Sequence, residues 1–408
     1  MPAHGLPAQS VSLSPQAVQA LDAAFAQAVQ SDALVCAIAM ACSRDGTLYQ
    51  SAHGLRDRES GAAATLDDVL ALASLTKAIT AAAALQLVEQ GVLDLDAPVG
   101  TYLDDLADPM VLEGFAADGR PRLRSAQRAI TLRHLLTHTS GLGHDIWDEP
   151  LLRYQAATGM PGLASRKDAG LCMPLLSDPG EMWRYSIGLE WTGKLIEAVT
   201  GLRLGAYLKA RLFGPLGMHD TGFGPAAHPA ERLAKVYHRD DTGALQPVPF
   251  AILPGEYEAG GGGLYGTAPD YLRFLTMLLN HGKAGDLQVL SPRSVALMTE
   301  NQIAPLELTP LRTAQPALSN NVSLFPGINK GWSLGGMLTE QAGPDGRSPG
   351  SLAWAGLANC YFWLDPQRGV AGVFLTQILP FADAPALQSF AGFERLFYTG
   401  LRSAALQA

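Results

Sequence analysis

Hydrophobic and polar positions at the start of the chain predict one helix followed by two strands. Residues 14–30 carry apolar side chains at helical spacing, and Ser14 can cap the first turn. The apolar runs 33–42 and 47–53 are separated by a short polar turn, which is typical of two neighbouring strands. We therefore expect a helix that is followed at once by a pair of antiparallel strands.

Helical patterns dominate the next part of the chain. An Ala/Leu-rich helix is expected from about Lys77 to Gln90, where a glycine follows. Between about 95 and 260 the patterns are short and broken by Pro and Gly, with helices expected at 131–140 and 186–200. This middle region is predicted to be helix-rich.

The pattern returns to strands towards the end of the chain. Strands are expected near 331–339, 351–357, 360–365 and 370–377, and a last helix fits 384–404. Strands near both chain ends predict an α/β (α+β) fold with a mainly antiparallel sheet flanked by helices. We expect a discontinuous α/β domain, 1–95 with 261–408, and a helix-rich insertion domain, 96–260.

Composition excludes several classes of protein. The chain has 408 residues, of which 48% are hydrophobic and 16% are charged, so it can bury a large core and is not disordered. Asp plus Glu (38) outnumber Lys plus Arg (29), and the net charge of −9 argues against a nucleic-acid partner.

Targeting and redox features favour a cytoplasmic protein with no membrane partner. No Lys or Arg precedes Arg44, and the longest apolar run, 33–42, is too short to span a bilayer. The four cysteines form no CxxC pair and lie in apolar surroundings, so we expect buried free thiols rather than disulfides.

Two patterns resemble catalytic or metal motifs but lack their context. Ser348 lies in a literal G-x-S-x-G, yet a turn precedes it, a strand follows it, and the last histidine is His281. A hairpin loop is the better interpretation. His134, His138 and His144 have the spacing of a zinc frame, but a leucine replaces the general-base glutamate. Structural hydrogen bonds are expected there, and metal binding without that chemistry stays open.

The third pattern is Ser74-x-x-Lys77. One such match is expected by chance roughly 0.4 times in this chain, so the motif alone is weak. Its context strengthens it, because Ser74 lies where a loop enters a helix and Lys77 follows on the same helix face. A lysine on the apolar side of a helix favours a catalytic base over a structural role.

Two further patterns complete a recognisable series. Residues 179–191 read PGEMWRYSIGLEW and place Tyr185 just before a helix, and residues 351–363 carry Trp354-Ala355-Gly356 in a strand. The order of S-x-x-K, Y-S-x and W-x-G resembles the family VIII carboxylesterases, relatives of class C β-lactamases and penicillin-binding proteins. Residues 130–142 and 260–270 also look like family segments, and in the latter Thr267 and Asp270 are expected to form a capping box.

The resemblance implies a serine β-lactamase-like fold and a covalent mechanism. Ser74 would attack a small-molecule ester, with Lys77 and Tyr185 sharing the roles of general base and acid. By similarity, the backbone N–H groups of Ser74 and Leu357 would bind the oxyanion, and Gly356 would permit close backbone approach. No metal or organic cofactor is implied.

The chain departs from the β-lactamase pattern at two expected substrate-binding positions. Ile187 stands where the related enzymes carry an asparagine, and Trp354 stands where they carry a lysine. Both changes favour a neutral, apolar ester over an anionic β-lactam. The alternatives are an acyltransferase that passes the acyl group to an alcohol or amine, a weak β-lactamase, and a non-catalytic binding module on the same fold. The sequence leaves the oligomeric state open.

Overall fold

The centre of the molecule is an antiparallel sheet built from both ends of the chain. The computed structural model describes residues 11–403. The sheet has eight strands in the order β14-β15-β16-β17-β18-β2-β3-β4, and every neighbouring pair is antiparallel. Their bounds are β2 (Cys36–Ser43), β3 (Thr47–Asp57), β4 (Ala62–Ala63), β14 (Lys330–Trp332), β15 (Met337–Thr339), β16 (Ser351–Gly356), β17 (Cys360–Asp365) and β18 (Val370–Leu375). Pairing of β18 with β2 joins the two chain ends, as the sequence predicts.

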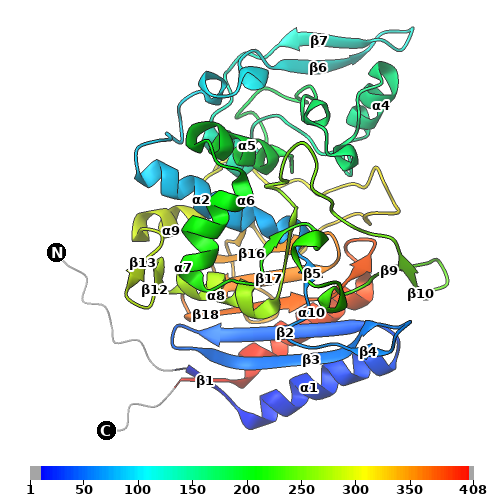
Figure 1. Ribbon diagram of the computed structural model, residues 1–408, viewed down its shortest axis with the longest axis vertical. Coiled ribbons are helices and arrows are strands. Elements are labelled where there is room, and N and C mark those ends of the chain that lie inside the picture. The colour runs from blue at the N-terminus through cyan, green and yellow to red at the C-terminus, as the bar shows by residue number, and fades with distance from the viewer. Residues whose placement is uncertain (1–10, 404–408) are drawn as a thin grey trace.

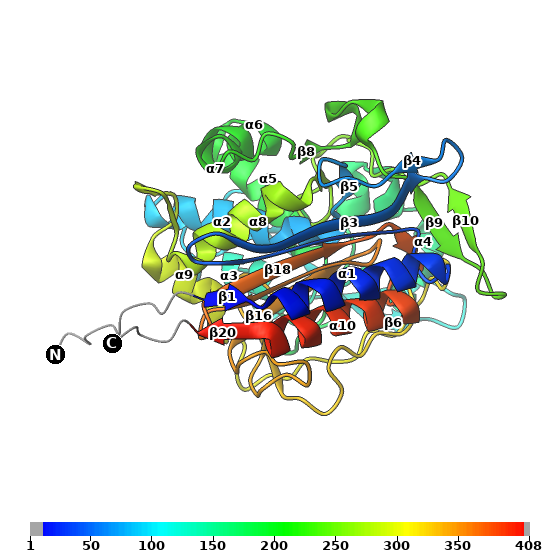
Figure 2. The ribbon, with the colours of Figure 1, turned by 90° about the horizontal axis from the view of Figure 1, so that it is seen from below.

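Helices cover both faces of this sheet. Helices α1 (Pro15–Gln30) and α10 (Ala384–Gly400) lie side by side on one face (Figure 2). Phe25 of α1 and Phe393 of α10 meet edge-on with ring centroids 5.6 Å apart, so the terminal helices share one apolar layer. Helix α8 (Ala268–Leu279) packs on β2 and β18 from the opposite face.

The middle of the chain, drawn in cyan to green, extends from the top of the molecule in Figure 1 down to the level of the sheet. Its helices are α3 (Leu132–Thr137), α4 (Glu149–Thr158), α5 (Gly188–Thr200), α6 (Leu204–Leu208) and α7 (Gly214–Leu216). Helix α5 packs against α3 and against α2 (Thr76–Glu89), the helix that follows Ser74. A further helix, α9 (Pro292–Thr299), lies against α2.

Short strands complete the fold. They are β1 (Val11–Leu13), β5 (Leu70–Ala71), β6 (Met110–Phe115), β7 (Pro121–Ser125), β8 (Gly222–Phe223), β9 (Val236–Arg239), β10 (Leu245–Val248), β11 (Leu264–Gly266), β12 (Lys283–Ala284), β13 (Leu287–Gln288), β19 (Ile378–Leu379) and β20 (Leu401–Ser403). The hairpins β6–β7 and β9–β10 lie in the region predicted to be helix-rich, so that prediction missed its strands.

Several predicted boundaries need correction. The helix expected at 131–140 ends at Thr137, because His138 adopts the left-handed conformation (φ 59°). The pattern at 331–339 forms two strands rather than one, and a turn connects them. The helix expected at 384–404 ends at Gly400, after which β20 pairs with β1.

The expected capping box at α8 is only half formed. The backbone N–H of Asp270 donates to the Thr267 hydroxyl, as predicted. The Asp270 carboxylate, however, accepts hydrogen bonds from the Asp220 backbone and the Thr221 hydroxyl instead. It therefore fixes a neighbouring loop rather than the N-terminus of its own helix.

The cysteines are all free thiols, but one is not buried as expected. Cys36, Cys42 and Cys360 are buried, and Cys172 is exposed. Burial raises the pKa of Cys36 to about 12, so this thiol stays protonated and inert.

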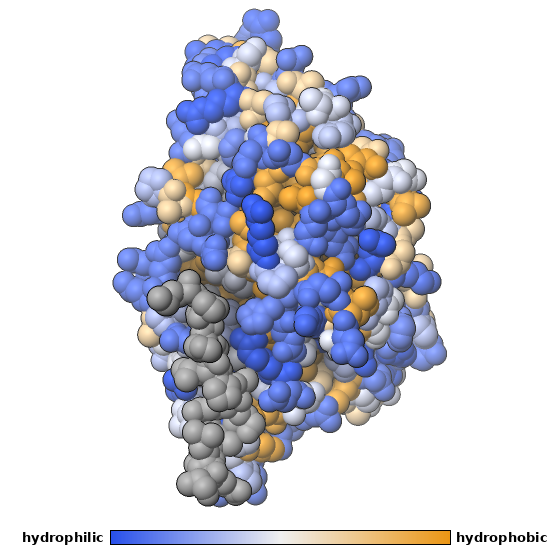
Figure 3. Space-filling view, turned by 90° about the vertical axis from the view of Figure 1, so that its left-hand side faces the viewer, coloured by the Kyte–Doolittle hydropathy of each residue, from blue (hydrophilic) through white to orange (hydrophobic). Residues whose placement is uncertain are grey.

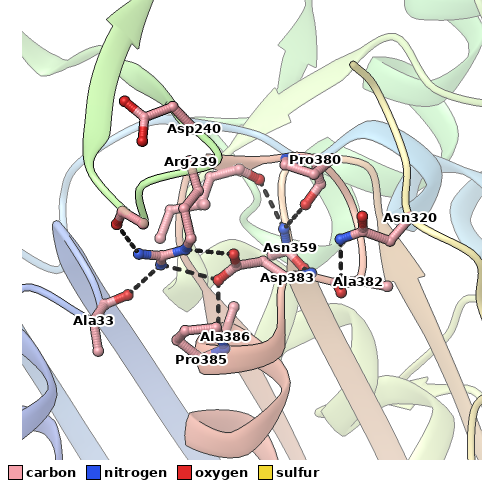
Figure 4. A network of polar contacts seen from close by, with 12 residues as sticks. Ala33, Arg239, Asp240, Asn320, Asn359, Pro380, Ala382, Asp383, Pro385 and Ala386 are labelled. Carbon is pink, nitrogen blue, oxygen red and sulfur yellow. Dashed lines mark hydrogen bonds and ion pairs between the residues drawn. The ribbon is translucent and has the colours of Figure 1, made fainter. Parts of the chain in front are cut away.

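A buried polar network holds the loop between β18 and α10 (Figure 4). The Arg239 guanidinium donates to both carboxylate oxygens of Asp383, which also caps α10 by accepting from the Ala386 backbone. The Asn359 side-chain amide donates to the carbonyls of Ile378 and Pro380. These bonds fix the loop that carries Phe381 into the cavity described below.

The surface gives no indication of a membrane-spanning helix. The face drawn in Figure 3 is mostly hydrophilic, with its largest apolar area in the upper half. None of the helices among residues 11–403 is both long enough and apolar enough to cross a membrane.

Candidate active site

One cavity of about 380 Å³ brings together most of the residues that the sequence singles out. Ser74, Lys77, Tyr185, Trp354, Gly356 and Leu357 all line it. Apolar side chains from distant segments complete its wall; they are Ile146, Trp147, Leu163, Phe250, Ile252, Leu311, Leu318 and Phe381. Its size and mixed lining suit an organic molecule of moderate size.

Ser74 lies in a strained turn at the entry to α2. It belongs to a single 3₁₀ turn, Ala73–Leu75, and Ala73 has the left-handed φ of 46°. The Thr76 hydroxyl holds this turn by donating to the Ala73 carbonyl at 2.6 Å and accepting from the Leu264 backbone at 3.1 Å. A non-glycine residue at positive φ costs energy, which is often tolerated where it presents a functional side chain.

The Lys77 amine lies against the Ser74 hydroxyl. Its Nζ is 3.2 Å from Ser74 Oγ and donates to the Gly261 carbonyl at 2.6 Å. Lys77 is only 7% exposed, so the amine has little access to bulk water. The distance to Ser74 Oγ is within the reach needed for proton transfer.

A buried carboxylate that the sequence analysis missed holds the Gly261 segment in place. Glu190 of α5 accepts a hydrogen bond from the Gly261 backbone N–H at 2.9 Å. Gly261 therefore links the carboxylate of Glu190 to the amine of Lys77. The available signal was an acidic residue on the apolar face of the helix predicted at 186–200.

Tyr185 lies between Lys77 and a group of aromatic rings. The Lys77 Nζ is 4.9 Å from the centre of its ring, and its hydroxyl accepts a hydrogen bond of 3.1 Å from Trp354 Nε1. The rings of His138 and Trp147 pack against it with centroid distances of 4.6 and 5.2 Å. Packed in this way, Tyr185 lines the same cavity as Ser74.

Strand β16 ends directly on the turn that carries Ser74. A Cβ atom on Gly356 would lie 2.3 Å from the Leu72 carbonyl oxygen, so no side chain fits at this position. The close approach places Leu357 on the same cavity wall as Ser74. Their backbones can then face one bound carbonyl group.

Ile187, an expected substrate-binding residue, does not line the cavity. It is 2% exposed and belongs to the hydrophobic core at the start of α5. Its backbone N–H donates to the Gly143 carbonyl, and its side chain packs in the core. Ile187 therefore contributes to the fold rather than to the cavity surface.

The three histidines with zinc-like spacing have separate roles. His134 forms a capping box with Thr131 at the start of α3, and His138 Nδ1 accepts from the Ser186 backbone N–H at 3.1 Å. His144 lines the cavity next to Asp145. The described part of the chain holds no cluster of three or more metal-ligating side chains.

Ser348 lies outside the cavity. Its backbone N–H donates to Asp365 and its carbonyl accepts from Ser351, so the segment is a hydrogen-bonded loop. The neighbouring Arg347 forms a buried ion pair with Glu394 of α10. The G-x-S-x-G sequence thus serves to fasten this loop to the last helix.

The chain belongs to the beta-lactamase family, because the family model described as Beta-lactamase matches residues 21–392. Monacolin J acid methylbutanoyltransferase of Aspergillus terreus (strain NIH 2624 / FGSC A1156) is 33% identical over 398 residues, covering 93% of this chain and 95% of the relative. Lovastatin esterase of Penicillium rubens is 32% identical over 375 residues, covering 88% and 93%. The predicted resemblance is therefore confirmed at the level of the family.

Solved structures confirm the predicted fold. Unliganded simvastatin synthase (LovD) from Aspergillus terreus, as its selenomethionyl derivative, aligns with a TM-score of 0.83 at 30% identity, covering 97% of this chain and all of that chain (100%). The protein is a serine enzyme of the β-lactamase fold whose relatives include esterases and acyltransferases.

Proposed function

We propose that this chain is a serine carboxylesterase that cleaves small to medium carboxylic esters through an acyl-enzyme on Ser74. The observation that carries the proposal is the 3.2 Å contact between Ser74 Oγ and the buried Lys77 Nζ on the wall of the cavity. A serine hydroxyl is a weak nucleophile, and an adjacent base within hydrogen-bond reach is what activates it.

The reaction divides into two acyl transfers. Ser74 Oγ attacks the ester carbonyl carbon and gives its proton to the Lys77–Tyr185 pair, which returns a proton to the leaving alcohol. Water then attacks the acyl-enzyme, and the same pair carries its proton back to Ser74 Oγ. The Lys77 Nζ lies 4.9 Å from the centre of the Tyr185 ring, and this proximity supports a shared role for the two groups.

Backbone groups stabilise the charge that develops on the carbonyl oxygen. In this proposal the N–H groups of Ser74 and Leu357 bind that oxygen, and the close approach at Gly356 supports the arrangement. Every step uses groups of this chain, so the proposal needs no cofactor. The apolar lining favours esters with hydrophobic acyl or alcohol portions.

The test is covalent labelling. Incubation with a fluorophosphonate, followed by intact-mass measurement and peptide mapping, should place one phosphonyl group on Ser74. Ser74→Ala should abolish both labelling and ester hydrolysis, whereas the matched control Ser348→Ala should keep both. An adduct on Ser348, or turnover that survives in Ser74→Ala, would overturn the proposal.

A second candidate is acyl transfer to an alcohol or amine. Two observations favour it: a methylbutanoyltransferase and a synthase align over nearly the whole chain. Hydrolysis and transfer differ only in whether water or a bound acceptor captures the acyl group. Product analysis with a fixed acyl donor and increasing alcohol separates them, because a transferase forms the new ester at alcohol concentrations far below that of water.

Weak β-lactamase activity and simple binding are the remaining alternatives. Trp354 lines the cavity where the β-lactamase pattern has a lysine, so the cation expected to meet a β-lactam carboxylate is absent from that position. We expect hydrolysis of a chromogenic cephalosporin to be far slower than that of a simple ester. Multiple turnovers of any ester would exclude a pure binding module.

A further inference from the structure

Arg166 lies on the wall of the cavity, and its backbone is held in place by neighbouring loops. Arg166 is a lining residue of the cavity and ends a 3₁₀ turn. Its backbone has the left-handed conformation, with φ 55°. Its carbonyl accepts from the Glu256 backbone N–H at 2.9 Å, and its own N–H donates to Leu163. A Cβ on Gly255 would lie 2.2 Å from Arg166 Cβ, so the two loops interlock and hold the base of the side chain.

The Arg166 guanidinium forms no ion pair with any of residues 11–403. No carboxylate oxygen of that part of the chain lies within 4.0 Å of it. The phenol of Tyr257 lies nearby: burial and the negative charge of Glu190 raise the pKa of this phenol, and the charge of Arg166 and its side-chain contact with the phenol oppose the rise. The Tyr257 hydroxyl is buried and has no hydrogen-bond partner among the described residues.

The other charged groups on the cavity wall are already engaged. The Asp145 carboxylate accepts from the Leu163 backbone at 3.2 Å and lies 3.3 Å from His144 Nδ1. The Glu190 carboxylate accepts from Gly261, and the Lys77 amine contacts Ser74 and Gly261. Arg166 is therefore the cation of this cavity wall that is paired with no carboxylate of residues 11–403, and its contact with the neutral Tyr257 phenol leaves its charge uncompensated.

We propose that Arg166 binds a carboxylate carried by the ester substrate, some distance from the bond that is cleaved. A guanidinium matches a carboxylate with two parallel hydrogen bonds, and the apolar wall around it strengthens that contact. A single cation beside Asp145 and Glu190 suits a monoanion better than a doubly charged phosphate. The proposal rests on the esterase function and names its substrate class as carboxylate-bearing esters.

A cation at Arg166 offsets the loss of charge at Trp354. The tryptophan removes the cation that β-lactamases place at the end of the corresponding strand, which by itself favours neutral esters. Arg166 supplies a cation from a different loop of the same cavity. In this proposal, the cavity binds a carboxylate at Arg166 rather than at the position of Trp354.

The test compares two esters that differ in one charge. The p-nitrophenyl monoester of suberic acid carries a free carboxylate, and its methyl ester is the neutral partner; kcat/KM is measured for each after subtraction of uncatalysed hydrolysis. We expect the ratio of acid to neutral kcat/KM to fall about 10- to 100-fold in Arg166→Met. Arg166→Lys should restore part of the ratio, and the exposed-site control Arg122→Met should leave it unchanged.

Direct binding separates failure of this inference from failure of the esterase proposal. In the Ser74→Ala protein, calorimetry should show tighter binding of the suberate monoester than of its methyl ester, and the additional Arg166→Met change should remove the difference. An equal acid-to-neutral ratio in wild type and Arg166→Met, or equal affinities in the Ser74→Ala pair, overturns the role of Arg166. Absence of hydrolysis with intact charge-dependent binding would count against the esterase alone.

Discussion

The indole Nε1–H of Trp354 donates a 3.1 Å hydrogen bond to the hydroxyl oxygen of Tyr185, 169 residues away in the sequence. Trp354 belongs to strand β16, and Tyr185 lies in the loop just before α5. The bond therefore ties the end of the sheet to the helical part of the molecule at the cavity wall. Because the indole is neutral, it orients the phenol without adding a charge.

Trp354→Phe tests this relationship. Phenylalanine keeps an aromatic ring but cannot donate to Tyr185, so the phenol loses a positioning contact. A buried neutral hydrogen bond contributes about 1 kcal/mol, and we expect kcat to fall roughly 3- to 30-fold. Steady-state kinetics with a chromogenic ester should show the loss mainly in kcat, with a smaller change in KM.

Trp363→Phe is the matched control. Trp363 is buried in β17 against α10, and its indole nitrogen has no hydrogen-bond partner in the described part of the chain. The substitution should lower the free energy of unfolding without a comparable loss of kcat. Equal effects of both substitutions on kcat would contradict a specific role for the Trp354–Tyr185 bond.

Gly356→Ala should separate the end of β16 from the Ser74 turn. Its new Cβ would meet the Leu72 carbonyl oxygen at 2.3 Å, so β16 and the Ser74 turn must move apart. A displacement of about 1 Å at a catalytic site costs on the order of 100-fold in rate, and overpacking costs about 1–3 kcal/mol of stability. Ester hydrolysis and urea unfolding measure the two effects.

Gly392→Ala is the control for Gly356→Ala, because an alanine at Gly392 should not displace its surroundings. Gly392 lies inside helix α10, and the nearest atom to an added Cβ is 3.9 Å away. Alanine there should stabilise the protein by about 0.5–1 kcal/mol and leave hydrolysis unchanged. A Gly356→Ala enzyme with full activity would show that the strand and the turn can separate without harm to the site.

Glu190→Ala should weaken the positioning of the Lys77 amine, because Glu190 holds Gly261 and Gly261 holds Lys77. Removal of the carboxylate leaves the Gly261 N–H without its 2.9 Å acceptor, and the carbonyl of the same residue holds Lys77 Nζ. We expect kcat/KM to fall about 10- to 100-fold, since an unsatisfied buried group costs about 1–3 kcal/mol. Glu190→Gln keeps an acceptor oxygen and should recover most of the activity.

Glu197→Ala controls for damage to helix α5 itself. Glu197 lies on the same helix but accepts from the Leu204 backbone, away from the cavity. Its loss should affect stability more than activity. If Glu190→Gln is as impaired as Glu190→Ala, the charge of Glu190 matters in its own right and the positioning role is insufficient.

The sequence predicts the parts of the fold and site that depend on local pattern. Continuous apolar runs indicate the central strands and α2, which are buried on nearly all sides. A helical period indicates α1 and α10, which bury one face. The short motifs identify Ser74, Lys77, Tyr185 and Gly356, which lie next to recognisable element ends.

Contacts between distant segments account for what the sequence could not predict. The Glu190–Gly261 bond joins residues 71 positions apart, and Arg166 gains its place only when the loop at Gly255 packs on it. Ile187 is expected at the substrate from its place in the Tyr185 motif, whereas the start of α5 buries its side chain in the core. Spacing along the chain does not specify which side of a loop faces a cavity.

His138 should make the stability of the protein depend on pH. Burial, reinforced by the nearby charge of Lys77, lowers the pKa of this imidazole well below its usual value of 6.5. The hydrogen bonding agrees, because Nδ1 accepts from the Ser186 backbone N–H and cannot also carry a proton. The folded protein therefore keeps His138 neutral, while the unfolded chain binds a proton there below about pH 6.5.

Stability supplied by neutral His138 is thus fully present above pH 6.5 and is lost as the pH falls below it. The loss approaches about 1.4 kcal/mol per pH unit for one group. His138→Asn removes this titration, and asparagine tolerates the left-handed backbone and can accept from Ser186. Urea unfolding from pH 7.5 to 5 should show a steeper fall for the wild type than for His138→Asn. The exposed-site variant His219→Asn should follow the wild type, and parallel curves for wild type and His138→Asn would show that the imidazole takes up a proton in the folded protein.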